Sequence, residues 1–165
     1  SLCDWSSTGA RPIERDRASK MHVQEELMPL TADELVQKSK EQRRLRQYEE
    51  ALVSSIAAAE SDHDNADAWW QIALNRLSLG DTRNAFPALE RTVELAPHFS
   101  LGWARYGTTL LTVGNPDSAK KNFEIALEKD PRQEEALKAL AGIYYRQNKD
   151  KDRTDEKELS ILTQL

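Results

Sequence analysis

The stretch SLGWARYGTTLLTVGNPDSAKKNFEIALEKDP, residues 100–131, determines the fold of this chain. Its apolar residues recur at steps of three and four on both sides of Gly114, which is typical of two short amphipathic helices joined by a tight turn. A similar pattern begins at Ala66, and a partial copy begins at Glu134. A fixed period of about 34 residues indicates an array of helical repeats.

The composition excludes several classes of protein. The 165 residues carry a formal net charge of −5, and we expect no nucleic-acid partner, because binding nucleic acid depends on neutralising phosphates with Lys and Arg. The single cysteine, Cys3, leaves no internal disulfide and no thiolate metal site. No apolar run approaches the roughly 20 residues needed to cross a bilayer, so we expect no transmembrane segment.

The beginning of the chain differs in character from the rest. Residues 1–30 show no sustained hydrophobic period, and we predict a flexible leader there, followed by a repeat domain over 31–165. The absence of an initiator Met suggests an excised domain or a processed product. We expect a cytoplasmic location. The alternative, suggested by the position of Cys3, is a periplasmic or lipid-anchored protein attached through that residue.

Several residues mark where helices of the repeat domain begin and end. The sequence Thr31-Ala-Asp-Glu34 is a capping box and predicts a helix from Ala32. Gly80 and Gly114 each follow an amphipathic segment, and we predict that both cap a helix in the left-handed conformation. Asn115 is then expected to cap the next helix.

Two positions are harder to interpret. Pro87 would cost about 3 kcal/mol in a helix interior, so we predict that Asn84 is an N-cap and that Pro87 lies in the first turn, with a kinked helix as the alternative. Near the end of the chain, Asn148 takes the place of the capping glycine. After it we predict a separate, polar capping helix over 153–164, which would close the array without exposing its core.

The two best copies share an aromatic residue at the start, a glycine turn, small residues beside a bulky one, and a final proline. These residues are Trp103, Tyr106, Gly107, Leu110, Gly114, Ala119, Phe123, Ala126 and Pro131 in one copy, and Trp69, Ile72, Ala73, Gly80, Ala85, Leu89 and Pro97 in the other. They resemble the tetratricopeptide repeat (TPR), a helix–turn–helix of about 34 residues. The second copy departs from the family pattern at Arg76 and Thr92, and the helix at the start of the domain is degenerate at Lys38 and Gln42.

The resemblance implies an all-α fold, a right-handed superhelix of TPR-like repeats with a C-terminal capping helix. The repeats would span about 32–65, 66–99 and 100–133, with a partial or capping repeat over 134–165. In such a superhelix the first helix of each repeat lines the concave side, where extended or helical peptides bind.

The concave side supplies the candidate functional site. It is expected to be apolar toward Trp70 and basic toward Lys138 and Arg146, which suits a peptide with an aliphatic or aromatic anchor and a carboxylate. For Trp70 the alternative is a place in the core between repeats. The candidate partner-binding residues are Trp70, Gln71, Leu74, Leu101, Arg105, Thr108, Thr112, Lys138, Tyr145 and Arg146.

Some family members hold the C-termini of chaperones with a clamp of Lys, Asn and Arg. In this chain Trp70 and Leu74 stand where the first Lys and Asn of that clamp are expected. We therefore do not expect a receptor for chaperone tails.

The sequence contains no recognisable catalytic arrangement. The three histidines are scattered, and no glycine-rich phosphate loop follows a predicted strand. We predict that the chain is not an enzyme and holds no cofactor or metal. The main hypothesis is a protein–protein interaction scaffold that binds a peptide or protein partner, with a homo-oligomer also considered. The alternatives are an accessory TPR region of a larger enzyme and a lipid-anchored assembly factor of the cell envelope.

Overall fold

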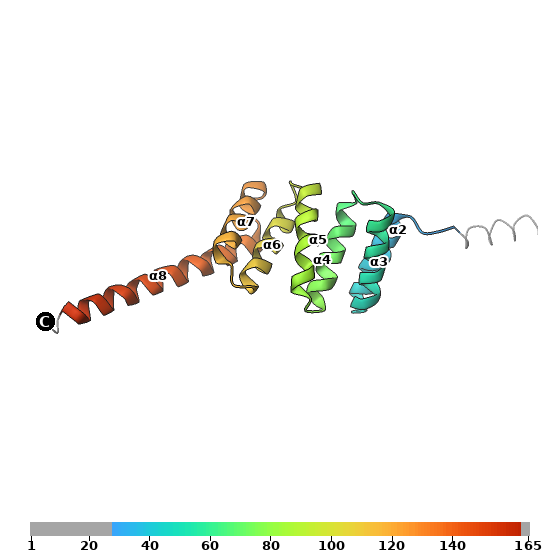
Figure 1. Ribbon diagram of the computed structural model, residues 1–165. Helices are drawn as coiled ribbons and strands as arrows, with labels where there is room; N and C mark the ends of the chain where they lie inside the picture. The colour runs from blue at the N-terminus through green and yellow to red at the C-terminus, as the bar shows by residue number, and fades with distance from the viewer. Residues whose placement is uncertain (1–27, 163–165) are drawn as a thin grey trace, which may run out of the picture. The chain divides into compact units, whose positions relative to one another are not determined.

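The computed structural model describes the backbone of residues 28–162 and the side chains of residues 28–151. The chain divides into two units, Ser1–Leu30 and Thr31–Leu165. Within residues 28–162 the regular elements are all α-helices, and there is no strand (Figure 1). The helices are α2 (Ala32–Arg44), α3 (Tyr48–Ser61), α4 (Ala66–Ser78), α5 (Thr82–Leu95), α6 (Ser100–Thr112), α7 (Pro116–Lys129) and α8 (Glu134–Leu162).

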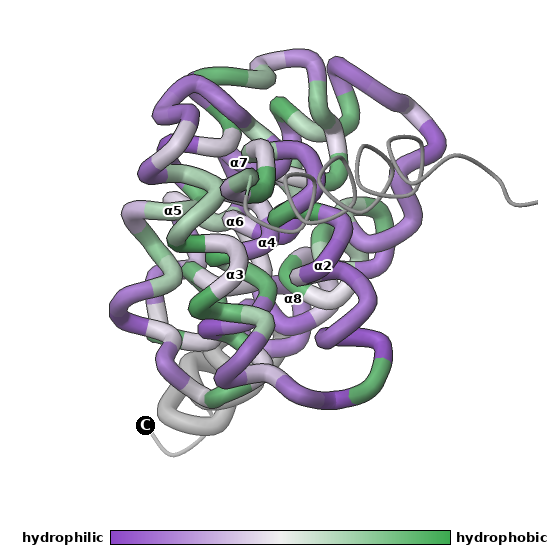
Figure 2. Tube along the Cα trace, turned by 90° about the vertical axis from the view of Figure 1, so that its right-hand side faces the viewer, coloured by the Kyte–Doolittle hydropathy of each residue, from purple (hydrophilic) through white to green (hydrophobic). Residues whose placement is uncertain are grey.

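The second unit is a helical repeat array, which confirms the predicted fold class. Helices α2 and α3, α4 and α5, and α6 and α7 form three pairs that stand in chain order (Figure 1). Helix α8 packs against α6 and α7, and its C-terminal part then extends beyond them. Apolar and polar segments alternate along each helix (Figure 2), as expected where one face packs against neighbours and the other meets water.

The turns inside the three pairs share one backbone geometry. The left-handed residue is Gly80 (φ 77°) in the second pair and Gly114 (φ 81°) in the third, as predicted, but Arg46 (φ 62°) in the first. In each turn the N–H groups of this residue and of the next residue donate to carbonyls of the preceding helix, at 2.9–3.1 Å, which makes a Schellman motif. A side chain in this conformation costs roughly 1–2 kcal/mol, so the first turn is the strained one.

The capping predictions hold at two helix starts. The backbone N–H of Thr31 donates to the Glu34 carboxylate at 2.8 Å, and the Glu34 N–H donates to the Thr31 hydroxyl at 3.3 Å, which completes the capping box. The hydrogen bond from the Thr31 backbone lowers the pKa of Glu34, because it stabilises the ionised carboxylate. Asn115 caps α7 by accepting from the Ser118 N–H at 3.2 Å.

The prediction for the start of α5 was wrong. The N-cap is Asp81, whose carboxylate accepts from the Asn84 N–H at 3.3 Å, so Pro87 lies inside the helix and not in its first turn. The helix starts early because the residue after the glycine turn is itself a good N-cap. Pro87 leaves the carbonyl of Arg83 without a helical partner, but both residues are exposed, so water can take that place.

The C-terminal prediction was also wrong, because α8 continues through Asn148 without a turn. No separate helix begins near residue 153. Asn148 lacks the conformational freedom of glycine, and the run KDKDRTDEKEL at 149–159 contains neither Gly nor Pro to interrupt the helix. The predicted cap of the array is therefore a continuation of its last helix.

Candidate functional site

The predicted groove residues do not form one open surface. Trp70 is 8% exposed and Gln71 is 2% exposed, so neither presents much of its side chain to a partner. The Trp70 ring packs edge-on against Phe99, with ring centroids 5.0 Å apart and planes at 87°. This corrects the expectation that Trp70 points into an open groove, and its burial matches the alternative of a core residue.

At the centre of the predicted surface, three side chains join α6 to α8. A guanidinium nitrogen of Arg105 lies 3.1 Å from a carboxylate oxygen of Glu135. The Thr108 hydroxyl donates to the other oxygen at 2.7 Å. The Glu135 side chain is only 24% exposed, so the positive charge expected from Arg105 is largely neutralised within the protein.

Glu135 is a functional candidate that sequence reasoning missed, although the repeat itself contained the signal. Leu101 was predicted to face the groove, and Glu135 stands one repeat length after it, at the same position of the next repeat. Asp67 stands one repeat length before Leu101. If the groove position of Leu101 had been assigned to the equivalent residue of every repeat, the predicted surface would have had a carboxylate at each end.

One position of each first helix contacts one position of the next first helix along the array. Lys40 forms an ion pair with Asp67 at 3.1 Å, and Thr108 is bonded to Glu135; both pairs lie 27 residues apart. In the middle of the array the corresponding residues, Leu74 and Leu101, are apolar, and both pack against the same buried cluster. The three pairs of positions are Lys40 and Asp67, Leu74 and Leu101, and Thr108 and Glu135.

A hollow of about 570 Å³, which we call the α6/α8 hollow, lies beside this cluster. Two of the predicted residues, Leu101 and Lys138, line it, but three carboxylates line it as well. The Lys138 ammonium lies 3.0 Å from the Glu134 carboxylate, and its hydrogen bond lowers the pKa of Glu134. The expected basic surface is therefore of mixed charge. The lining residues are Leu101, Asp130, Arg132, Gln133, Glu134, Glu135 and Lys138.

The remaining predicted residues lie apart from the hollow. Thr112 is exposed and its hydroxyl donates to a backbone carbonyl of its own helix at 3.0 Å. Tyr145 is exposed on α8. Arg146 lines a separate hollow of about 190 Å³ with Leu111 and Pro116. Whether any of the ten residues contacts a partner stays a prediction.

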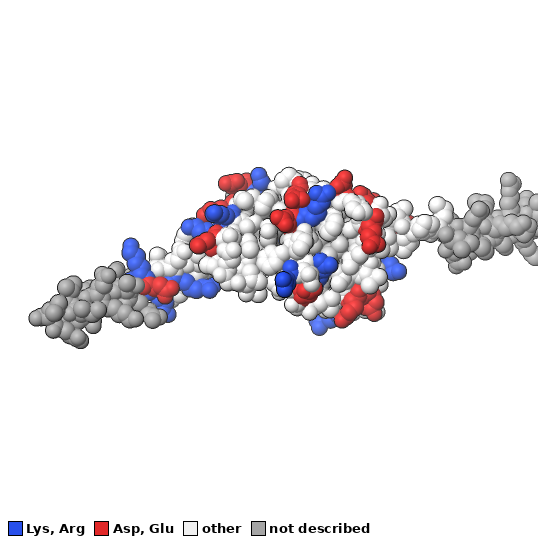
Figure 3. All heavy atoms as spheres, viewed as in Figure 1, with Lys and Arg blue, Asp and Glu red and all other residues white. Residues whose placement is uncertain are grey.

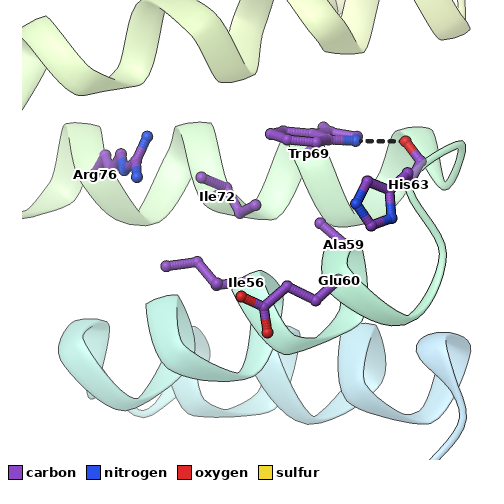
Figure 4. Close-up of a pocket in the computed structure, with 7 residues that line it drawn as sticks. All are labelled: Ile56, Ala59, Glu60, His63, Trp69, Ile72 and Arg76. Atoms are coloured by element: carbon purple, nitrogen blue, oxygen red, sulfur yellow. Dashed lines mark hydrogen bonds between the residues drawn. The ribbon is translucent and has the colours of Figure 1, made fainter.

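A further cavity, of about 230 Å³, lies between α3 and α4 and contains none of the predicted residues (Figure 4). Trp69, Ile72 and Arg76 of α4 line one side. The Trp69 indole N–H donates to the His63 carbonyl at 2.8 Å, which holds the ring along the cavity. The other side is formed by Ile56, Ala59 and Glu60 of α3.

The described residues offer no metal centre, since no group of three or more His, Cys, Asp or Glu side chains converges among them. No described helix is long and apolar enough to cross a membrane. Cys3, the residue suggested as a lipid attachment site, lies outside the described residues.

The stacked pairs, their period and their shared turns define a helical repeat protein. Two family models described as tetratricopeptide repeat match residues 66–99 and 105–152. The chain is a tetratricopeptide repeat protein.

Comparison with known proteins gives the same picture. DnaJ homolog subfamily C member 3 of Bos taurus is 31% identical over 97 residues, which cover 59% of this chain and 19% of the relative. Hsp70-Hsp90 organizing protein 1 of Glycine max is 28% identical over 128 residues, covering 77% and 22%. The chain thus spans about a fifth of the length of these relatives.

Among solved structures, the first TPR domain of Spaghetti (RPAP3) bound to the HSP90 peptide SRMEEVD superposes with a TM-score of 0.68. The sequence identity is 22%, and the match covers 72% of this chain and 94% of that domain. At this identity the likeness shows the fold alone.

Proposed function

We propose that the array is a non-catalytic scaffold that binds a peptide or protein partner in the α6/α8 hollow. The observation that carries the proposal is the hollow itself, where the predicted residues Leu101 and Lys138 line one open space next to Arg105. Structures of similar fold support it: two TPR domains of RPAP3 proteins are described as bound to an HSP90 and an HSP70 peptide.

The charges of the hollow define the chemistry of its partner. Arg105 is already paired with Glu135, so a partner carboxylate would have to displace an internal one. Asp130 is exposed and offers a carboxylate to a basic group, whereas Glu134 is paired with Lys138. Leu101 supplies an apolar contact. A peptide with an apolar side chain beside a Lys or Arg therefore fits better than one that ends in carboxylates.

The same argument disfavours the ligands of the similar structures. The peptides named there, SRMEEVD and SGPTIEEVD, each contain two adjacent glutamates. The α6/α8 hollow is lined by three carboxylates and two cations, so it offers no excess of positive charge to hold two adjacent glutamates, which agrees with the expectation that this chain is not a receptor for chaperone tails.

The test is partner capture by the purified chain, quantified by mass spectrometry. The hollow variant is Glu134→Lys with Lys138→Glu, which reverses two exposed charges without touching the core. The matched control is Glu41→Arg with Arg44→Glu, the same kind of exchange within an exposed ion pair of α2. The proposal expects at least a tenfold loss of specific partners with the hollow variant and none with the control. Equal capture by all three proteins would overturn it.

Three further hypotheses are untouched by these observations. A cytoplasmic location, a lipid anchor at Cys3 and an accessory role within a larger enzyme stay predictions. Membrane fractionation with lipid labelling would decide the second.

A further inference from the structure

The first half of α8 carries an apolar face that stays largely exposed among the described side chains, although Lys120 of α7 reaches one end of it. Leu137 is 45% exposed, Tyr144 is 44% exposed, and Ala141 between them is also exposed. The opposite side of the helix is buried against α6 and α7 through Ala136, Leu140 and Ile143. We call Leu137, Ala141 and Tyr144 the α8 face.

The repeat shows what kind of element covers such a face. The equivalent residues one repeat length earlier on α6 are Trp103, Gly107 and Leu110, and there α7 packs against them. In the earlier repeats the chain supplies this second helix by turning back after a left-handed residue. Helix α8 instead runs straight on through Asn148, so its continuation does not turn back onto the face.

The size of the covering side chain can be inferred from the earlier pairs. A Cβ atom on Gly107 would lie 2.7 Å from the ring of Phe123, so this pair requires glycine. One repeat earlier the pair is Ala73 and Leu89, both fully buried in one cluster. The glycine on the first helix is thus paired with Phe on the second helix, and the alanine is paired with the smaller Leu. Ala141 therefore calls for a Leu-sized partner and not for Phe.

The charges near Tyr144 define one end of the covering helix. The Lys120 ammonium lies 4.8 Å from the centre of the Tyr144 ring. Arg146 and Lys149 are exposed one turn further along, and Figure 3 shows Lys and Arg on this part of α8 with acidic atoms among them. In the existing pairs the second helix starts where the first ends, so acidic residues in the first turn of the covering helix would meet these cations.

We propose that the α8 face binds one amphipathic helix of a partner protein. This helix carries Leu flanked by small residues four positions before and three positions after it, as Leu89 is flanked by Ala85 and Thr92, and it has an acidic first turn. The site is separate from the α6/α8 hollow and does not rest on the function proposed there.

The probe is a fluorescent peptide of residues 116–129 carrying Phe123→Leu, held helical by a lactam on its solvent face, compared with the unmodified Phe peptide. The full chain is expected to bind the Leu peptide at least fivefold more tightly. Ala141→Gly removes the methyl group and should reverse that preference. Tyr144→Glu should weaken binding at least tenfold, whereas Val53→Glu, an exposed site on α3, should not change it.

Circular dichroism of each variant excludes a loss of folding as the cause. Binding that is absent, or indifferent to Ala141→Gly and Tyr144→Glu, overturns the proposal. Sedimentation equilibrium provides the other decisive outcome: a dimer that Tyr144→Glu dissociates would assign the α8 face to a second copy of the chain and overturn the partner helix.

Discussion

The first and third repeats have the same turn geometry and opposite interiors. In the first, the facing positions are Ser39 and Ser55, and the amide of Asn75 donates to both hydroxyls at 3.1 and 3.4 Å. In the third, the same two positions are Gly107 and Phe123, in direct apolar contact. The repeat thus specifies a spacing between helices, which either a polar pair or a small–large apolar pair can fill.

The two interiors differ in the stability that each should lose on truncation. Phe123→Ala removes a fully buried ring and leaves a cavity, and we expect a loss of about 3–5 kcal/mol in the free energy of unfolding. Ser55→Ala, at the equivalent position, removes a hydroxyl that donates to the Leu52 carbonyl and accepts from the Asn75 amide. Both partners keep other hydrogen bonds, so we expect a loss of about 1 kcal/mol in the free energy of unfolding. Urea denaturation of both variants would measure the difference, and equal losses would contradict the contrast between the two interiors.

The contacts between consecutive first helices should show a smaller contrast. Glu135→Ala leaves the partly buried Arg105 without its partner and removes the bond from Thr108, and we expect a cost of roughly 1–2 kcal/mol. Asp67→Ala breaks the exposed pair with Lys40 and should cost at most about 0.5 kcal/mol. A double-mutant cycle with Arg105→Ala and with Lys40→Ala isolates the two pair energies. A stronger Lys40–Asp67 coupling would refute the role assigned to burial.

The turns of the two repeats place different residues in the left-handed conformation, Arg46 in the first repeat and Gly114 in the third. Arg46→Gly should raise the free energy of unfolding by about 1 kcal/mol, because glycine adopts the left-handed conformation without a steric penalty. The melting temperature should rise by several degrees. Gly114→Arg is the reciprocal change and should lower stability by a similar amount. No change in either variant would mean that the turn conformation carries little strain.

The caps and turns that separate the helices could be predicted from the sequence. Gly80, Gly114 and the Thr31 capping box act through local backbone geometry, which depends on a few neighbours in the chain. The same reasoning gave a wrong end for α8, because an asparagine at position 148 permits a turn without requiring one. The absence of a helix breaker, and not the repeat register, decided how far α8 extends.

The candidate site was less predictable than the fold, because exposure depends on contacts between distant residues. Trp70 and Leu74 follow the same helical face in sequence, yet Trp70 is buried against Phe99, the N-cap residue of α6. The charge of Arg105 was correctly placed on α6, but its neutralisation by Glu135 depends on the approach of α8. Summing charges along one helix could not show that pairing.

The smallest expected effect concerns the capping box that opens the first repeat, which the third repeat replaces by an unassisted N-cap at Phe99. Because the pKa of Glu34 is lowered in the folded chain, its carboxylate stabilises the fold above its usual pKa, and this contribution is lost as the pH falls below roughly 4. Glu34→Gln should therefore lower the melting temperature slightly at pH 7 and leave it unchanged at pH 3. The control is Glu49→Gln, an exposed carboxylate in the first turn of α3. A difference between wild type and Glu34→Gln that persists at pH 3 would show that the side chain acts through packing and not through its charge.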